Sequence, residues 1–168
     1  MQKRKLTLII SLLLACFTLV SITSSASAAT LAPRTALLHE INRVRALHGV
    51  APVYPAVALQ AAANHHADDM MAHNYFAHTS PTGSSVYSRI VGSGFVNGYN
   101  WVGGETLAWG TGSLATPLGT VNAWLASPEH RSIMLSPTYH WVGISRTCGT
   151  YEGHASACVW TADWVQRS

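Results

Sequence analysis

The chain has 168 residues, and its charged side chains are few and nearly balanced, with ten Lys and Arg against seven Asp and Glu. Three of the ten basic residues are Lys3, Arg4 and Lys5, so the chain beyond them carries seven arginines against seven acids. A neutral domain lacks the basic surface that nucleic-acid-binding proteins use, and we therefore expect no nucleic-acid partner.

The first 28 residues have the build of a secretory signal peptide. A basic start is followed by an apolar stretch from Leu6 to Val20 and by the small-residue cleavage pattern Ala26-Ser27-Ala28. We expect cleavage after this pattern, secretion, and one mature domain over residues 29–168, with membrane contact only through the precursor's leader. The alternatives are an uncleaved anchor, which the length of the apolar run allows, and lipid attachment at Cys16.

Pro33 begins a helical pattern with one apolar face, and Gly49 follows as a stop. Asn42 and Arg45 lie three residues apart and are therefore neighbours on the surface of this helix. Two interpretations stay open from spacing alone. The pair forms a solvated polar edge, or the arginine is buried and ties the helix to a later loop.

A second, alanine-rich helix is predicted from Ala56 to Met71. His65, Asp69 and His73 are spaced by four residues and share one face of it. We interpret this row as the solvated side of the helix. A stripe of metal ligands is the alternative.

The middle of the chain alternates between loops and short elements. Residues 80–100 are rich in Ser, Gly and Asn and predict a structured loop with a short helical island. Residues 106–109 predict a short strand, and residues 118–126 predict a third helix. Ser127-Pro128-Glu129 has the sequence of a new helix start, with a capping serine, a proline in the first position and an acid near the positive end.

Two strand patterns end the chain, residues 141–145 and 158–165, with a glycine-containing loop between them. Cys148 and Cys158 lie on the two sides of this loop, and an even pair of cysteines in an exported chain indicates one disulfide. Helices flanking strands predict a single-domain α/β sandwich, and the cysteines predict that its C-terminal β-hairpin is disulfide-linked.

His78, Glu105 and His130 are the candidate functional residues, and we expect them to meet in one open cleft. His78 precedes a Thr-Ser-Pro-Thr-Gly turn, and Glu105 follows two glycines that allow close approach of the backbone. His130 lies in the first turn of a predicted helix, where the positive helix end favours neutral imidazole. Two imidazoles and a carboxylate could hold zinc or another divalent cation. The structural alternative is that they only join loops through hydrogen bonds.

Taken together, these segments resemble the CAP superfamily, which includes cysteine-rich secretory proteins, insect venom allergens and plant pathogenesis-related proteins, and in particular its bacterial SCP-like branch. The resemblance covers the whole predicted mature chain. The motifs that carry it are Asn42-x-x-Arg45, Phe76-x-His78-x-Ser80-Pro81-x-Gly83 with Arg89, Gly104-Glu105-Thr106-Leu107-Ala108, Ser127-Pro128-x-His130-Arg131 and Val142-Gly143-Ile144.

The resemblance implies the α-β-α sandwich of the CAP fold, with a wide cleft that presents two histidines and two acids and can bind zinc-like ions. By position, the histidines are His78 and His130, and the first acid is Glu105. The second acid has no positional match. Glu129 is a candidate for it, although it stands where the bacterial motif usually has glycine.

The expected function is a secreted, non-enzymatic binding module whose cleft holds a divalent metal and whose loops contact an unknown extracellular ligand, such as a lipid or a component of the cell envelope. One alternative is a metal-assisted hydrolase in which Glu105 or Glu129 acts as the base. Another is a lipid or sterol carrier with an aromatic groove. The residues for that groove are Trp101, Trp109, Trp141, Phe95 and Tyr99, which otherwise fill the core.

Overall fold

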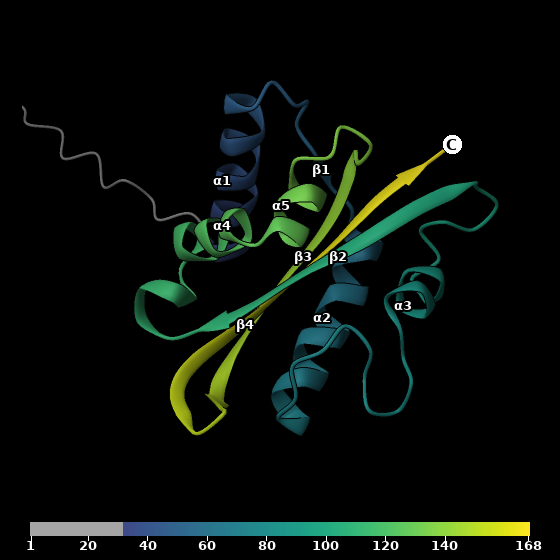
Figure 1. The fold of residues 1–168 in the computed structure, drawn as a ribbon. Coiled ribbons are helices and arrows are strands. Elements are labelled where there is room, and N and C mark those ends of the chain that lie inside the picture. Colours follow the sequence, from purple (N-terminus) through teal and green to yellow (C-terminus); the bar gives the residue numbers. More distant parts are fainter. Residues whose placement is uncertain (1–31) are drawn as a thin grey trace, which may run out of the picture. The chain divides into compact units, whose positions relative to one another are not determined.

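The computed structural model describes residues 32–168, and the predicted leader, residues 1–28, lies outside them. A four-stranded mixed sheet forms the middle of the fold, with the strand order β1-β3-β4-β2 (Figure 1). The strands are β1 (Tyr54–Pro55), β2 (Trp101–Gly110), β3 (Trp141–Tyr151) and β4 (His154–Arg167). β2, β4 and β3 pair antiparallel, and the short β1 runs parallel to β3.

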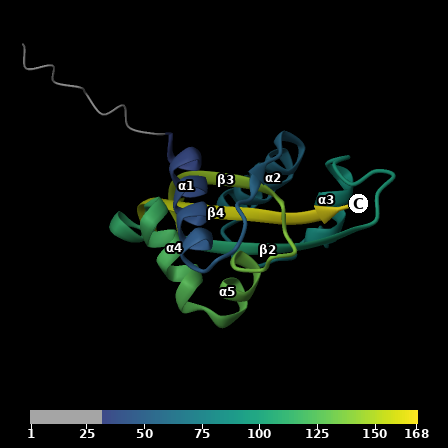
Figure 2. The same cartoon turned by 90° about the horizontal axis from the view of Figure 1, so that it is seen from above.

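Helices cover both faces of this sheet. They are α1 (Pro33–Leu47), α2 (Val57–His73), α3 (Val86–Gly92), α4 (Pro117–Ala126) and α5 (Pro128–Met134), and a single 3-10 turn spans Gly112–Ala115. Helices α4 and α5 lie on one face, and α2 lies on the other (Figure 2). Buried side chains of α1 share a core with α4, and Ile90 of α3 shares a core with Leu59 of α2. The predicted α-β-α sandwich is therefore confirmed.

Side chains of β4 pack in the hydrophobic cores on both faces of the sheet, because successive side chains of a strand point to opposite faces. Trp160 and Trp164 pack in the core beneath α1 and α4, whereas Val159 and Val165 pack on the face that α2 and α3 cover. All four side chains are fully buried. A strand that is buried on both faces has an apolar sequence without clear alternation, as observed here.

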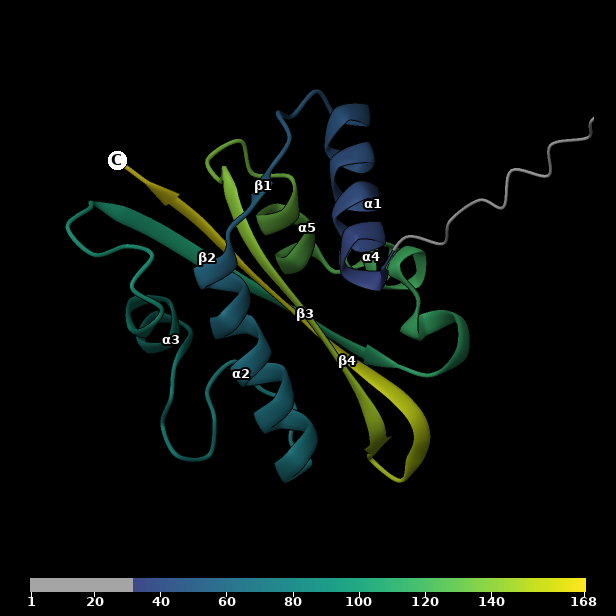
Figure 3. The same ribbon diagram turned by 180° about the vertical axis from the view of Figure 1, so that it is seen from behind.

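Helix α2 lies across the back of the sheet (Figure 3). Gly143 of β3 makes this close approach possible, since a Cβ atom at this position would collide with the backbone of Leu59 in α2. Gly143 pairs with Asp163, and Asp163 pairs with Glu105 of β2. Directly paired residues share a face of the sheet. These three residues therefore form one row across the sheet, beneath α2.

Arg45 of α1 is fully buried and ties its helix to the loop after α5. Its guanidinium donates hydrogen bonds to the carbonyl oxygens of Met134 (2.7 Å), Ser136 (3.0 Å) and Tyr139 (3.2 Å). Asn42 exchanges two hydrogen bonds with the backbone of Val53, so both polar residues of the motif fix loops to α1. The solvated-edge interpretation of Arg45 is wrong.

Strand β2 begins at Trp101, five residues before the predicted start at Thr106. The predicted strand left out Gly103-Gly104, but this segment also pairs with β4. The hydroxyl of Tyr139 lies 3.0 Å from the position that a Cβ atom of residue 104 would take. The glycine therefore serves close packing inside a strand.

The predicted disulfide is present and joins Cys148 to Cys158 across the β3–β4 hairpin. The two cysteines are direct partners in the strand register, so the bond closes the hairpin without displacing either strand. From Ala32 to the C-terminus, no helix is both long and apolar enough to cross a membrane.

Candidate functional site

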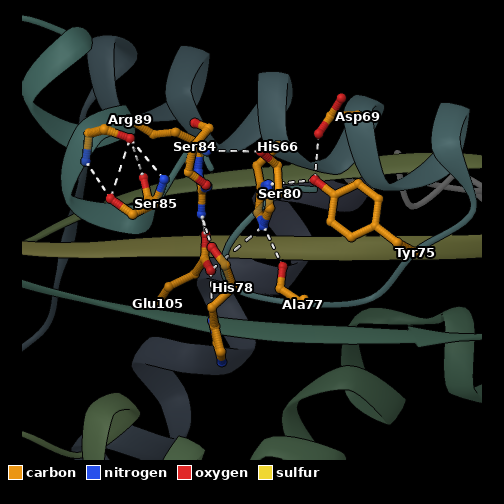
Figure 4. Close-up of polar contacts among 11 residues, drawn as sticks. His66, Asp69, Tyr75, Ala77, His78, Ser80, Ser84, Ser85, Arg89 and Glu105 are labelled. Atoms are coloured by element: carbon orange, nitrogen blue, oxygen red, sulfur yellow. Dashed lines mark hydrogen bonds and ion pairs between the residues drawn. The ribbon is translucent and has the colours of Figure 1, made fainter. Parts of the chain in front are cut away.

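Glu105 lies in β2, and its buried carboxylate is the centre of a polar cluster (Figure 4). One carboxylate oxygen accepts a hydrogen bond from the Nδ1–H of His78 at 2.7 Å. The other accepts one from Nη2 of Arg89 at 2.8 Å. Burial alone would raise the pKa of Glu105, but the hydrogen bond from His78 and the charge of Arg89 hold it below its usual value. Glu105 is therefore an anion with both oxygens engaged.

Arg89, in the last turn of α3, holds the loop of His78 as well as Glu105. Its guanidinium is almost fully buried and donates to the carbonyl oxygens of His78 (2.9 Å) and Ser84 (2.8 Å). Ser85 caps α3 with a hydrogen bond from the N–H of Ser88, which fixes the start of the short helix that carries Arg89. A single buried cation thus connects α3, the preceding loop and β2.

The hydrogen bond to Glu105 orients the imidazole of His78. A carboxylate can only accept, so the proton of the neutral ring lies on Nδ1 and the lone pair lies on Nε2. The side chain of His78 is 52% exposed, whereas that of Glu105 is fully buried. This is the arrangement by which a carboxylate orients a metal-binding histidine from behind.

His130 approaches His78 from the opposite face of the sheet. Ser127 caps α5 by accepting a hydrogen bond from the N–H of His130, so the predicted cap positions this histidine. The two imidazole centroids lie 6.4 Å apart. Burial, together with the charge that His78 can carry, lowers the pKa of His130, and its ring is therefore neutral near pH 7.

The structure thus brings His78, Glu105 and His130 together but gives them different surroundings. Glu129 precedes His130 and is exposed. Its carboxylate accepts a hydrogen bond from the hydroxyl of Ser127 at 3.1 Å. No hydrogen bond or ion pair between described residues links Glu129 to Glu105 or to His78.

Two further residues complete the cluster and were not identified from the sequence as site residues. The first is His66 of α2, which is buried. Its Nε2–H donates to the carbonyl of Ala77 at 2.9 Å, and the same nitrogen lies 3.9 Å from the carboxylate of Glu105. Burial lowers the pKa of His66, and the Glu105 charge opposes this only in part. The spacing of Ala62, His66 and Met70 on one apolar face was the signal for a buried histidine.

Asp163 is the second acid near Glu105, and the two residues are partners across β2 and β4. The side chain is fully buried, and neither of its oxygens has a hydrogen-bond partner among the described residues. Burial and the negative charge of Glu105 raise the pKa of Asp163 well above its usual value. Asp163 therefore keeps its proton where an ordinary aspartate has lost it, and Glu105 is the charged member of the pair.

His78 and His130 are the members of this cluster whose imidazoles could donate a lone pair to a cation. His78 has its lone pair on Nε2, and the ring centroids of His78 and His130 lie 6.4 Å apart, so one tetrahedral zinc ion would contact both rings only after a movement of one side chain. Glu105 is not free to bind an ion directly, because His78 and Arg89 occupy its oxygens. Across residues 32–168, no group of three or more His, Cys, Asp or Glu side chains is arranged to hold a metal. The donor set is two imidazoles, and water or a ligand would complete the coordination.

The row of His65, Asp69 and His73 on α2 makes other contacts. Asp69 pairs with His73 at 2.9 Å and accepts a hydrogen bond from the hydroxyl of Tyr75. Both histidines are exposed. This supports the interpretation of a solvated helix face that is held by local contacts.

A groove of about 760 Å³ continues from His78 along β2. Of the five aromatic residues that suggested a lipid groove, Tyr99 and Trp101 line it. Phe95 and Trp141 instead pack against each other, with ring centroids 5.8 Å apart, and Trp109 packs against Tyr151 at 5.3 Å. The aromatic set is therefore divided between the groove and the core.

Comparison with known proteins identifies relatives for most of the chain. Residues 38–164 match the family model described as "CAP: Cysteine-rich secretory protein family". The uncharacterized protein YkwD of Bacillus subtilis is 29% identical over 143 residues, which are 85% of this chain and 51% of that protein. The chain thus spans about half the length of this relative.

Solved structures share the fold. An extracellular protein of Bacillus anthracis with an SCP domain aligns over 80% of this chain and 40% of its own, with a TM-score of 0.66 and 22% identity. An outer surface protein of Borrelia burgdorferi aligns over 82% of this chain and 97% of its own, with a TM-score of 0.67 and 20% identity. A cysteine-rich secretory protein of Staphylococcus aureus aligns over 79% and 38%, with a TM-score of 0.57 and 14% identity.

The family match and the shared fold agree with the motifs in the sequence, from the Asn42–Arg45 pair to the strand that contains Gly143. The disulfide between Cys148 and Cys158 is consistent with export, and two of the similar structures are described as extracellular or secretory. The chain belongs to the CAP family of cysteine-rich secretory proteins.

Proposed function

We propose that this protein is an extracellular binding module in which His78 and His130 together bind a divalent cation and Glu105 positions His78. The hydrogen bond from Nδ1 of His78 to Glu105 carries the proposal, because it leaves the second ring nitrogen as a lone-pair donor toward solvent. A bound cation would supply a Lewis-acidic position for an oxygen or nitrogen atom of a ligand. The disulfide and the extracellular relatives support a location outside the cell.

The surroundings of the acids favour binding over hydrolysis. A general base must accept a proton during the reaction, and its pKa is best near the working pH. The hydrogen bonds that lower the pKa of Glu105 make it a poor base at neutral pH. The pKa of Glu129 is also lowered, by its own backbone N–H and by Ser127. Neither carboxylate named in the hydrolase alternative suits that role.

Calorimetry with zinc tests the proposal. His78→Ala and His130→Ala should each abolish measurable zinc binding, and Glu105→Gln should weaken it by about 10–100-fold, as loss of a positioning carboxylate does. His39→Ala is the matched control, because His39 is an exposed histidine on α1. Zinc affinity that is unchanged in both cleft variants would remove the cation from the proposed function.

A further inference from the structure

The groove beside His78 runs along an unpaired strand edge. β2 is the last strand of the sheet, and β4 is its partner on one side only. Residues 101–105 of β2 form one wall of the groove, and Val86, Tyr87 and Ile90 of α3 contribute the other. The free edge of β2 therefore faces a hollow that a ligand can enter.

The strand register identifies the backbone groups that point into this hollow. Asn100 and Ser168 each donate to the other's carbonyl, at 3.1 and 2.9 Å, so they form a hydrogen-bonded pair. Such pairs alternate with non-bonded pairs in antiparallel strands, so the N–H and C=O groups of Trp101 and Gly103 point away from β4. Leu107 has the same phase, and its carbonyl accepts a hydrogen bond from the Trp124 indole at 2.9 Å on the outer side of β2.

The outward backbone groups of Trp101 and Gly103 make no hydrogen bond to any described residue. Near Leu107 the same edge is covered by α4, so the free segment is short and lies at the groove. An unpaired edge presents N–H groups with partial positive charge alternating with C=O groups with partial negative charge. The ligand with the complementary alternation is another extended polypeptide backbone.

We infer that an extended peptide segment of a partner protein binds in this groove as a fifth strand, paired with β2 at Trp101 and Gly103. The inference rests on the proposed function as a binding module, but it does not depend on the cation. A lipid tail would leave the same N–H and C=O groups without partners, which is unfavourable once water is excluded.

The side chains around the edge indicate which peptides fit. Three large hydrophobic side chains of the groove are exposed, namely Tyr87 (66%), Tyr99 (49%) and Val102 (46%). Tyr87 packs against Trp101 with ring centroids 5.1 Å apart, which gives α3 an apolar surface beside the edge. Because side chains of a strand alternate, every second residue of the peptide would contact this surface. We therefore expect peptides in which apolar residues occur at alternate positions.

Amide NMR spectra of the protein test the inference with a defined probe, an acetylated and amidated hexapeptide in which threonine and valine alternate. Titration should shift the amide resonances of Trp101 and Gly103. The same peptide with every backbone nitrogen methylated keeps its side chains, becomes more apolar and loses its N–H groups. Its affinity should be at least tenfold lower. Equal or tighter binding of the methylated peptide would overturn the inference. Amide shifts that depend on protein concentration alone would also overturn it, because they would indicate that a second copy of this chain binds at the edge.

Two tyrosines give matched variants. Tyr87→Ala should weaken peptide binding by about two- to fivefold, the size of an aromatic contact beside a strand. Tyr54→Ala should leave it unchanged, since Tyr54 is a similarly exposed tyrosine that packs on Trp141 at the opposite edge of the sheet. Equal effects of the two variants would contradict the assignment to the β2 edge.

Zinc and EDTA separate this inference from the proposed cation site. If the protein binds no zinc but the peptide still binds in EDTA, the cation site is refuted and the peptide inference stands. Zinc binding that is lost in His78→Ala, without any peptide-induced shift at Trp101 or Gly103, would refute the peptide and keep the cation.

Discussion

Replacement of Arg89 by methionine should be among the most damaging single changes in this protein. The substitution preserves much of the volume of the side chain but removes the buried cation that contacts Glu105, His78 and Ser84. Breaking a buried ion pair by removing one partner costs about 3–5 kcal/mol, because the remaining charge stays buried. Domains of this size have unfolding free energies of about 5–15 kcal/mol, so this loss is a large share of the total.

A surface pair in the same chain is the control. Arg43 donates to Glu40 at 2.8 Å, the same distance as in the Arg89–Glu105 pair, but the Arg43 side chain is 46% exposed whereas that of Arg89 is 3% exposed. Exposed pairs contribute about 0–1 kcal/mol, and Arg43→Met should therefore have little effect. The contact distance is the same in the two pairs, but Arg89 also donates to two carbonyl oxygens, so the difference between the two variants reports burial together with those hydrogen bonds.

Urea denaturation of the wild type and both variants measures these free energies. A double-mutant cycle with Glu105→Gln then separates the Arg89–Glu105 interaction from the hydrogen bonds that Arg89 donates to the two carbonyls. We expect the double variant to be more stable than the sum of the single losses implies, because the glutamine that replaces Glu105 carries no charge. A cost below about 1 kcal/mol for Arg89→Met, equal to that of Arg43→Met, would refute the reasoning.

Reduction of the Cys148–Cys158 bond should lower the free energy of unfolding by about 2–3 kcal/mol, as expected for a short closed loop, and denaturation with and without reductant measures it. Asp163→Asn should stabilise the protein at pH 7 and do so less near pH 4. Burial raises the pKa of Asp163 in the folded state, so the wild type loses stability as the pH rises above the unfolded pKa of about 3.9, whereas asparagine does not ionise. A melting temperature of Asp163→Asn below that of the wild type at pH 7 would contradict this. His66→Gln should make stability less sensitive to acid. Burial lowers the pKa of His66 in the folded state, so below about pH 6.5 the unfolded wild type binds a proton more readily and the folded state loses stability. Between pH 7 and pH 5 the melting temperature of the wild type should therefore fall more than that of His66→Gln. An equal fall in both proteins would count against this reasoning.

The helices and the hairpin that depend on residues close together in the sequence were predicted correctly. The serine and proline before His130 marked the start of α5 correctly, and the two cysteines marked the hairpin that they join. The first three helices of the sequence prediction are observed as α1, α2 and α4, each with an apolar face of helical period. Such features depend on residues a few positions apart, so the sequence contains their signal.

Features that depend on distant pairing were missed or misplaced. The first half of β2 contains two glycines and has a low intrinsic preference for strand, and it is extended because β4 pairs with it. Asp163 lies in the middle of an apolar strand, and its position beside Glu105 follows from register, which spacing along the chain does not reveal. Arg89 belonged to a recognised motif, but its role depends on a carboxylate 16 residues away.

The row of Gly143, Asp163 and Glu105 connects the seating of α2 to the geometry of the cleft. His66 comes from α2 and Glu105 from the outer strand, so the gap between their side chains depends on how deeply the helix sits at residue 143. A methyl group at residue 143 would collide with the backbone of Leu59 and move α2 away from the sheet. The glycine of the Val142-Gly143-Ile144 motif therefore controls, from two strands away, how the carboxylate behind His78 is held.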